Sequence, residues 1–111
     1  MNLKKNALAL ALSLGLGLSA GFASAEEIYI PLISKGFQHQ FWQVVKAGAE
    51  QAAKDLNVKV TFEGPESEAM VDKQIDMLAA VIAKKPAAIG YAALDSKAAI
   101  PLLKKAQAAK I

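Results

Sequence analysis

The fold is decided by one stretch, residues 28–62, which reads IYIPLISKGFQHQFWQVVKAGAEQAAKDLNVKVTF. It begins with a near-continuous apolar run, residues 28–33, as is typical of a strand buried on both faces. Apolar residues then recur every three or four positions, which predicts an amphipathic helix from Gln40 to Leu56. Residues 58–62 alternate between apolar and polar and predict a second strand. Two strands joined through a helix of this length must be parallel, so the stretch is a β-α-β unit.

The alternation of strand and helix patterns continues to the end of the chain. Ser67 is expected to cap a second helix. The apolar face of that helix is formed by Val71, Ile75, Leu78 and Ile82. Small apolar residues at 87–93 predict a third strand, and Asp95 or Ser96 is expected to cap a third helix. Because Pro101 lies in the first turns of this helix, its regular part is expected to begin after the cap.

The order β-α-β-α-β-α predicts an α/β protein that begins an open, doubly wound parallel sheet with right-handed crossovers. Pro31 lies inside the first predicted strand and argues mildly against it, since proline has no N–H group to donate. A parallel sheet of three strands has two unpaired edges, which natural domains rarely leave uncovered. We therefore expect the domain to be incomplete at its C-terminal end.

Residues 1–25 have the composition of a secretory signal peptide. Two lysines precede an apolar run, residues 7–18, and small residues lead to a predicted cleavage site after Ala25. The run is shorter than the roughly 20 apolar residues that a membrane-spanning helix needs, and glycines interrupt it. Cleavage would leave residues 26–111, which can form one small domain.

The composition excludes several classes of protein. The whole chain has a formal net charge of +3, and loss of the lysines in the signal peptide brings the charges close to balance. The sequence has no basic stripe of the kind that follows a phosphate backbone, so we expect no nucleic-acid partner. It has no cysteine, which excludes disulfides, thiolate metal ligands, a cysteine nucleophile and a lipid anchor on a cysteine. We expect a soluble protein exported to the periplasm.

No catalytic template is present in the sequence. It has no P-loop, no GxGxxG after the first strand, no HExxH and no GxSxG. A single histidine without cysteine does not form an ordinary transition-metal site unless carboxylates supply the remaining ligands. Glu63, Glu66 and Glu68 fit a solvated cluster at a helix start better than a pair of catalytic acids. We therefore expect no enzymatic activity, no cofactor and no metal.

The sequence does contain residues suited to binding a sugar. In open α/β sheets, ligands bind beyond the carboxyl ends of the strands, where residues 34–42, 63–67 and 92–96 are expected to lie. Aromatic rings pack against the C–H faces of a pyranose, and polar side chains bind its hydroxyl groups. The candidates are the rings of Phe41 and Trp42 and the polar groups of Lys35, His39 and Asp95.

Spacing alone leaves the role of the aromatic residues open. Phe41 lies on the same apolar face of the predicted helix as Val45, which favours a position in the core over one in a pocket. Trp42 lies about 100° further round the helix, so the two rings cannot both point into the core. The lone histidine, His39, has the same ambiguity between a structural and a binding role.

Three motifs carry a family resemblance: Lys35-Gly-Phe-Gln-His-Gln-Phe-Trp42, Glu63-Gly-Pro-Glu-Ser67 and Ile89-Gly-Tyr-Ala-Ala-Leu-Asp-Ser96. Together with Gln74-Ile75 and residues 100–106, they resemble the N-terminal segment of periplasmic sugar-binding proteins of the ribose, allose and galactose type. Those proteins are the solute receptors of ABC import systems, and their two α/β lobes close over a sugar. The resemblance implies that the mature chain is about half of the N-terminal lobe of a periplasmic binding protein-like I fold.

The resemblance also implies a set of ligand-binding residues. They are Lys35 and His39 for the hydroxyl groups, Phe41 and Trp42 for the ring face, and Ala92, Leu94 and Asp95 for the turn at the pocket edge. Ribose-binding members typically have Asn-Pro where this chain has His39-Gln40, and they tend to carry Asn where Ala92 stands. The implied ligand is therefore a sugar or sugar-like molecule, and ribose itself is not implied.

These observations predict a non-enzymatic receptor that binds a monosaccharide in the periplasm and delivers it to an ABC permease in the inner membrane. Ligand-driven closure of two lobes would be its mechanism. The alternative is a periplasmic sugar-sensing module that feeds a chemoreceptor or a histidine kinase. The export signal argues against a LacI-type repressor, and the missing phosphate and flavin motifs argue against a flavodoxin-like enzyme.

Overall fold

The computed structural model describes residues 26–111, and the predicted signal peptide, residues 1–25, lies outside the described residues. Strands and helices alternate along the described chain, which confirms the predicted β-α-β-α-β-α order. The elements are β1 (Tyr29–Ile33), α2 (Gln40–Leu56), β2 (Lys59–Glu63), α3 (Val71–Ala83), β3 (Gly90–Tyr91) and α4 (Ile100–Ala108). No helix between residues 26 and 111 combines the length and apolar character needed to cross a membrane.

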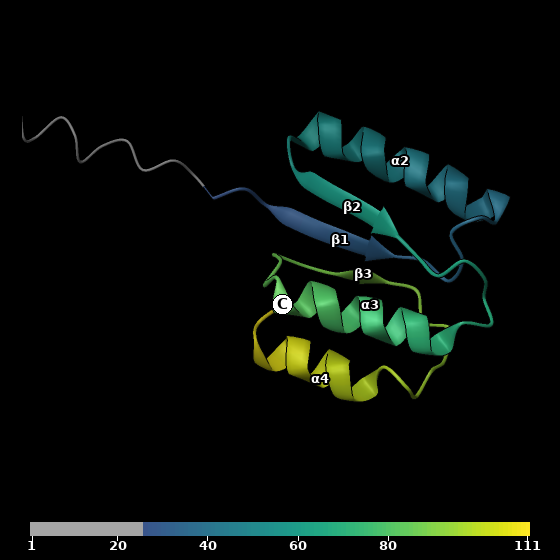
Figure 1. Ribbon diagram of the computed structural model, residues 1–111. Coiled ribbons are helices and arrows are strands. Elements are labelled where there is room, and N and C mark those ends of the chain that lie inside the picture. Colours follow the sequence, from purple (N-terminus) through teal and green to yellow (C-terminus); the bar gives the residue numbers. More distant parts are fainter. Residues whose placement is uncertain (1–25) are drawn as a thin grey trace, which may run out of the picture.

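The strands form a parallel sheet in the order β2-β1-β3 (Figure 1). β1 lies in the centre, where Leu32 is level with Phe62 of β2 and with Gly90 of β3. α2 lies beside β2 on one side of the sheet, and α3 and α4 lie together on the other side (Figure 1). All three strands therefore end at the same edge of the sheet.

β1 divides its side chains between the two faces of the sheet. Pro31 and Ile33 are buried, and Ile33 belongs to the hydrophobic core that α3 and α4 form. Leu32, which points the opposite way, lines a cavity with Trp42 of α2. The core therefore lies on the α3 and α4 side of the sheet.

The third strand is shorter than the predicted range, residues 87–93, because β3 covers only Gly90–Tyr91. On this side of β1, the carbonyl groups of Tyr29 and Ile33 accept hydrogen bonds from the segment that contains β3. Successive residues of a strand bond to alternate neighbours in a parallel sheet, so Pro31 also faces this side. Its missing N–H removes a ladder bond, and regular pairing begins only beyond it.

α2 has the predicted bounds but not the predicted burial. Asn57, in the left-handed conformation with φ of 53°, ends it. Among the described residues, α2 contributes no buried side chain, and Val44 is 68% exposed. The helix lies beside β2 near the edge of the sheet, so its apolar stripe meets only part of the sheet face.

The predicted Ser67 cap is wrong. α3 begins at Val71, after Met70, and no described side chain caps it by a hydrogen bond. Residues 67–70 form a separate turn instead, in which the Met70 N–H donates to the Ser67 carbonyl at 3.3 Å. The late start of the third predicted helix is confirmed, because α4 begins at Ile100 and Pro101 occupies its first turn. The predicted cap at Asp95 or Ser96 is wrong, because the N-cap of α4 is Ala99 and no described side chain caps it by a hydrogen bond.

We predict that Gly64→Ala lowers the free energy of unfolding by about 2 kcal/mol, a typical cost of overpacking. A Cβ atom at residue 64 would collide with Ser34 Oγ and would lie 3.1 Å from the Ser34 carbonyl oxygen. Urea denaturation of the protein measures the change. Gly48→Ala in α2 is the matched control, since its added Cβ would meet no described atom within 4 Å apart from its chain neighbours and the backbone of its own helix. It should raise the free energy of unfolding by about 0.5–1 kcal/mol. Equal effects at both positions would contradict the crowding at Gly64.

Candidate functional site

The carboxyl ends of the parallel strands meet at one edge, where the sequence predicted a binding site. Two segments carry most of the candidate residues. The β1 loop, residues 34–39, leads from β1 into α2, and the β3 turn, residues 92–95, follows β3. The β1 loop is tied to the segment after β2, because the Phe37 N–H donates to the Pro65 carbonyl at 2.8 Å.

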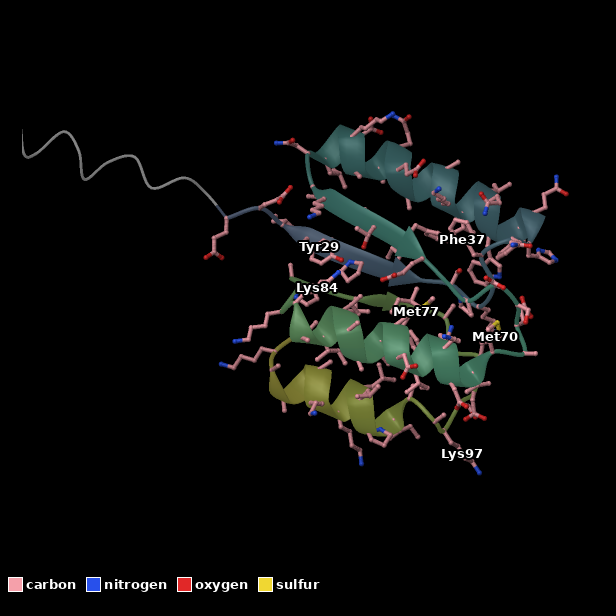
Figure 2. The ribbon with its side chains drawn as sticks, in the orientation of Figure 1. Tyr29, Phe37, Met70, Met77, Lys84 and Lys97 are labelled. Atoms are coloured by element: carbon pink, nitrogen blue, oxygen red, sulfur yellow. The ribbon has the colours of Figure 1, made fainter. Side chains whose placement is uncertain are left out.

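Phe37 also anchors the β1 loop to α2 (Figure 2). The Gln43 side-chain amide donates a hydrogen bond to the Phe37 carbonyl, and Lys46 Nζ lies 5.4 Å from the centre of the Phe37 ring. Lys46 pairs in turn with Glu50 at 3.7 Å. The loop that carries the half-buried Lys35 is therefore held on two sides.

His39 is the N-cap of α2. Its Nδ1 accepts a hydrogen bond from the Phe41 N–H at 3.1 Å, and its backbone is extended. This bond requires an unprotonated Nδ1 and leaves Nε2 of the exposed ring free to meet a ligand. The structural and binding roles considered for His39 are therefore compatible, because they use different nitrogen atoms.

The rings of Phe41 and Trp42 contact each other edge to face, with centroids 4.9 Å apart and planes at 83°. Phe41 is 59% exposed, so the core position that spacing favoured for it is wrong. The reason is that the first turn of α2 extends past the carboxyl ends of the strands (Figure 1). Trp42 is half-buried instead, and its indole Nε1 lies 3.4 Å from Glu68 Oε1.

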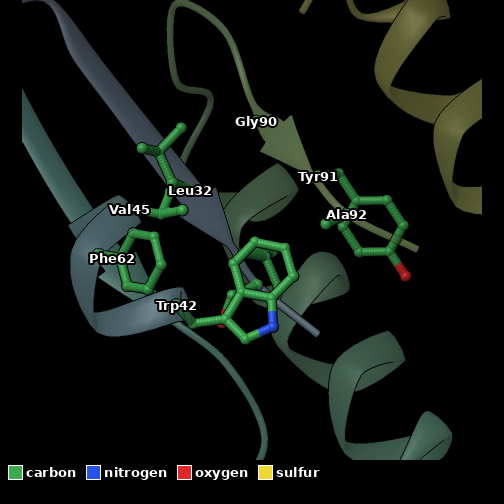
Figure 3. Close-up of a pocket in the computed structure, with 9 residues that line it drawn as sticks. Leu32, Trp42, Val45, Phe62, Gly90, Tyr91 and Ala92 are labelled. Carbon is green, nitrogen blue, oxygen red and sulfur yellow. The ribbon is translucent and has the colours of Figure 1, made fainter. Parts of the chain in front are cut away.

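Trp42 lines a cavity of about 250 Å³ between α2 and the sheet (Figure 3). Its lining is mainly apolar and comes from all three strands and α2. The lining residues besides Trp42 are Leu32, Ile33, Ser34, Val45, Phe62, Gly90, Tyr91 and Ala92. The cavity is smaller than the roughly 300–1,000 Å³ of ordinary small-molecule pockets. In this cavity the indole of Trp42 lies next to the end of β3.

Gln74 of α3 is the polar centre of this edge. Its side chain is 0% exposed. Its Nε2 donates to the Ser34 carbonyl at 2.9 Å and to the Ala92 carbonyl at 2.8 Å. Its Oε1 accepts from the Tyr91 hydroxyl at 2.8 Å and from the Leu94 N–H at 2.9 Å. Both donors and both acceptor positions of the carboxamide are thus used.

Gln74 was not among the site residues predicted from the sequence. Its position in the sequence could have identified it. Gln74 lies three residues after Val71 and four before Leu78, which places a polar side chain on the apolar face of the helix. A buried polar side chain must find hydrogen-bond partners, and strand ends offer backbone groups that the ladder leaves free. Among the described residues, no buried side-chain nitrogen or oxygen lacks a partner.

The β3 turn is stabilised by Asp95. Its Oδ1 accepts from the N–H groups of Lys97 at 2.8 Å and Ala98 at 2.7 Å. These two backbone hydrogen bonds lower the pKa of the exposed Asp95 carboxyl below its ordinary value. Burial, and secondarily the charge of Asp95, raise the pKa of Tyr91. The Tyr91 hydroxyl therefore stays protonated and able to donate to Gln74.

The structure brings only some of the candidate residues together. Trp42 and Ala92 line the same cavity, and Ala92 and Leu94 bond to the same Gln74 side chain. The remaining candidates occupy separate positions along the same edge. Lys35 lies in the β1 loop, His39 and Phe41 lie at the start of α2, and Asp95 lies in the β3 turn.

Comparison with known proteins gives one family. Residues 30–111 match the model of the family described as periplasmic binding protein domain. No curated protein matches the sequence. The resemblance seen in the sequence motifs is confirmed by this family match and by the solved structures that the fold resembles.

Three solved structures illustrate the similarity. An ABC transporter, LacI family transcriptional regulator from Brachyspira murdochii is 42% identical with a TM-score of 0.72, and the match covers 77% of this chain and 26% of that one. A carbohydrate transporter solute binding protein from Agrobacterium radiobacter, in complex with D-arabinose, is 40% identical with a TM-score of 0.72, covering 78% and 29%. An ABC transporter periplasmic solute binding protein from Actinobacillus succinogenes 130z, with bound D-allose, is 29% identical with a TM-score of 0.73, covering 77% and 30%. The chain thus spans less than a third of their length.

We predict that the capping bonds of the β3 turn are lost in acid. The lowered pKa means that Asp95 stabilises the turn above its ordinary pKa and stops doing so as the pH falls through the lower, folded-state value. NMR titration should show the Lys97 and Ala98 amide resonances moving together, with a midpoint below 3.8, the ordinary pKa of the group. Asp95→Asn is the control and should abolish this movement. A midpoint above the ordinary value would contradict the capping geometry.

Proposed function

Because this chain belongs to the periplasmic binding protein domain family, we propose that it forms part of the N-terminal lobe of a sugar receptor. Residues 1–25 direct export and are cleaved after Ala25, and residues 26–111 work in the periplasm. The receptor binds a monosaccharide or sugar-like ligand and delivers it to an ABC permease in the inner membrane. Proteins of this family bind solutes and are not enzymes, in agreement with the missing catalytic motifs.

One observation carries the proposal: an exposed aromatic ring and free polar groups stand at the carboxyl edge of the sheet. Phe41 is 59% exposed although it lies in a well-formed helix, and it is braced edge to face by Trp42. An exposed, braced ring offers a flat apolar surface at low entropic cost, which suits the C–H face of a sugar. The bound D-arabinose and D-allose of two similar structures support a sugar as the ligand class.

The polar candidates complete the proposed site. Lys35 and Nε2 of His39 would bind hydroxyl groups on the α2 side, and the Asp95 carboxylate would bind them on the β3 side. Ala92 and Leu94 would form the wall between Trp42 and Asp95. Charged partners suit sugar hydroxyls because hydrogen bonds to ionised groups are stronger than those between neutral groups.

Closure over the ligand would need a second lobe. The solved structures extend well beyond the part that this chain matches, and the exposed face of Phe41 is free to meet such a lobe. A ligand that contacts both lobes favours the closed arrangement over the open one by the difference in its affinity for the two. The closed form would then be the one presented to the permease.

We predict that one monosaccharide stabilises the full-length protein strongly. Thermal-shift measurements with D-arabinose, D-allose, D-ribose and D-galactose, followed by calorimetric titration, provide the test. A ligand at 100 times its Kd raises the free energy of unfolding by about 2.7 kcal/mol. A response to FMN or a nucleotide and to none of the sugars would contradict the proposal.

We also predict that Phe41→Ala weakens sugar binding by about fivefold, as expected for loss of roughly 1 kcal/mol of ring contact. The free energy of unfolding should hardly change, because the ring is largely exposed. Val44→Ala is the matched control on the same helix, being 68% exposed and outside the proposed site. Loss of stability in the Phe41 variant, with unchanged affinity of the folded protein, would restore the core interpretation of this residue.

A further inference from the structure

We propose that Gln74 is a positioning residue, whose buried carboxamide fixes the β3 turn relative to the β1 loop and thereby sets the geometry of the sugar site. This inference rests on the proposed function. Gln74 is 0% exposed and cannot touch a ligand itself. Its influence on binding would therefore act entirely through the segments to which it bonds.

The bonds of Gln74 lie where the sheet ends. The last ladder bond between β1 and the β3 side runs from the Ala92 N–H to the Ile33 carbonyl at 3.0 Å. The next backbone groups are the carbonyls of Ser34 and Ala92, and both accept from the Gln74 side chain. The carboxamide thus continues the pairing beyond the point at which the strands separate.

All four hydrogen bonds of the Gln74 side chain go to Ser34 or to residues 91–94, next to the proposed sugar site. Three of the four bonds hold residues 91–94, and the fourth holds the first residue of the β1 loop. Leu94 is bonded through its N–H, so the position of the turn is set at its backbone. Asp95 follows directly, and its carboxylate is proposed to bind sugar hydroxyls. A shift of the turn would move Ala92, Leu94 and Asp95 together.

Removal of the carboxamide would leave one buried and two half-buried backbone groups without these partners. In Gln74→Met, a side chain of similar length replaces it, and the carbonyls of Ser34 and Ala92 and the Leu94 N–H lose their bonds. The turn can regain partners only by moving toward water. Tyr91→Phe removes a single bond, from the hydroxyl, and leaves the three backbone bonds in place.

The test uses two independent measurements on the full-length protein. Amide hydrogen exchange reports the position of the turn without any sugar, and calorimetric titration with D-arabinose and D-allose reports affinity. Gln74→Met should speed exchange of the Leu94 amide and weaken sugar binding by the folded protein, each by about tenfold or more. Tyr91→Phe should weaken binding by only about threefold, with the turn still protected.

Further variants distinguish an effect on the position of the β3 turn from a general loss of stability. Gln51→Met changes an exposed glutamine of α2 that bonds only to Asp55 among its described neighbours, and should alter neither measurement. Gln74→Asn keeps a carboxamide that is one methylene too short to reach all four partners, and should fall between the Tyr91→Phe and Gln74→Met variants. If Gln74→Met does not fold, the order of the remaining two variants decides the question.

The outcomes distinguish this inference from the proposed function. Unchanged exchange at Leu94 in the Gln74 variants, or lower stability with unchanged affinity, would overturn the positioning role. If the unsubstituted protein binds no sugar, the proposed function fails, and faster exchange at Leu94 would still establish that Gln74 holds the turn.

Discussion

The parallel pairing of β1 with both of its neighbours is the constraint on which the rest of this structure depends. It requires long crossover connections, which in this chain contain the helices α2 and α3, and it brings all three carboxyl ends to one edge. Residues that are far apart in the sequence, such as Trp42 and Ala92, meet there because they follow β1 and β3, which run in the same direction. The location of the site is thus a result of strand direction, before any side chain is considered.

The two faces of the sheet contribute differently. α3 and α4 close one face with the buried residues of the core, and α3 places Gln74 at the strand ends. α2 keeps its side chains exposed or half-buried, and its first turn carries the aromatic pair beyond the sheet. A well-buried layer therefore supports the turn after β3, while a more exposed helix presents the rings and the His39 cap.

Much of this fold could be predicted from the sequence, because it follows from the spacing of apolar residues and from the residues that begin or end helices and strands. The bounds of α2, the order of the elements and the delayed start of α4 at Pro101 all come from local patterns. The predictions that failed depend on tertiary context. Ser67 has the chemistry of a cap but lies in a turn, and the exposure of Phe41 depends on how far α2 extends past the strands. The role of Gln74 could not be predicted without the positions of the strand ends, since its partners are backbone atoms from segments distant in sequence.

Pro31 also bears on how the chain selects its register. A parallel strand can slip by two residues without moving any side chain to the other face, so burial alone does not align β3 with β1. If β3 slipped toward the amino end of β1, its ladder would need the N–H group that Pro31 lacks. The proline thereby disfavours the slipped pairings and favours the one that sets Tyr91 level with Ile33. A residue that removes a hydrogen bond from the sheet thus improves the accuracy with which the sheet assembles.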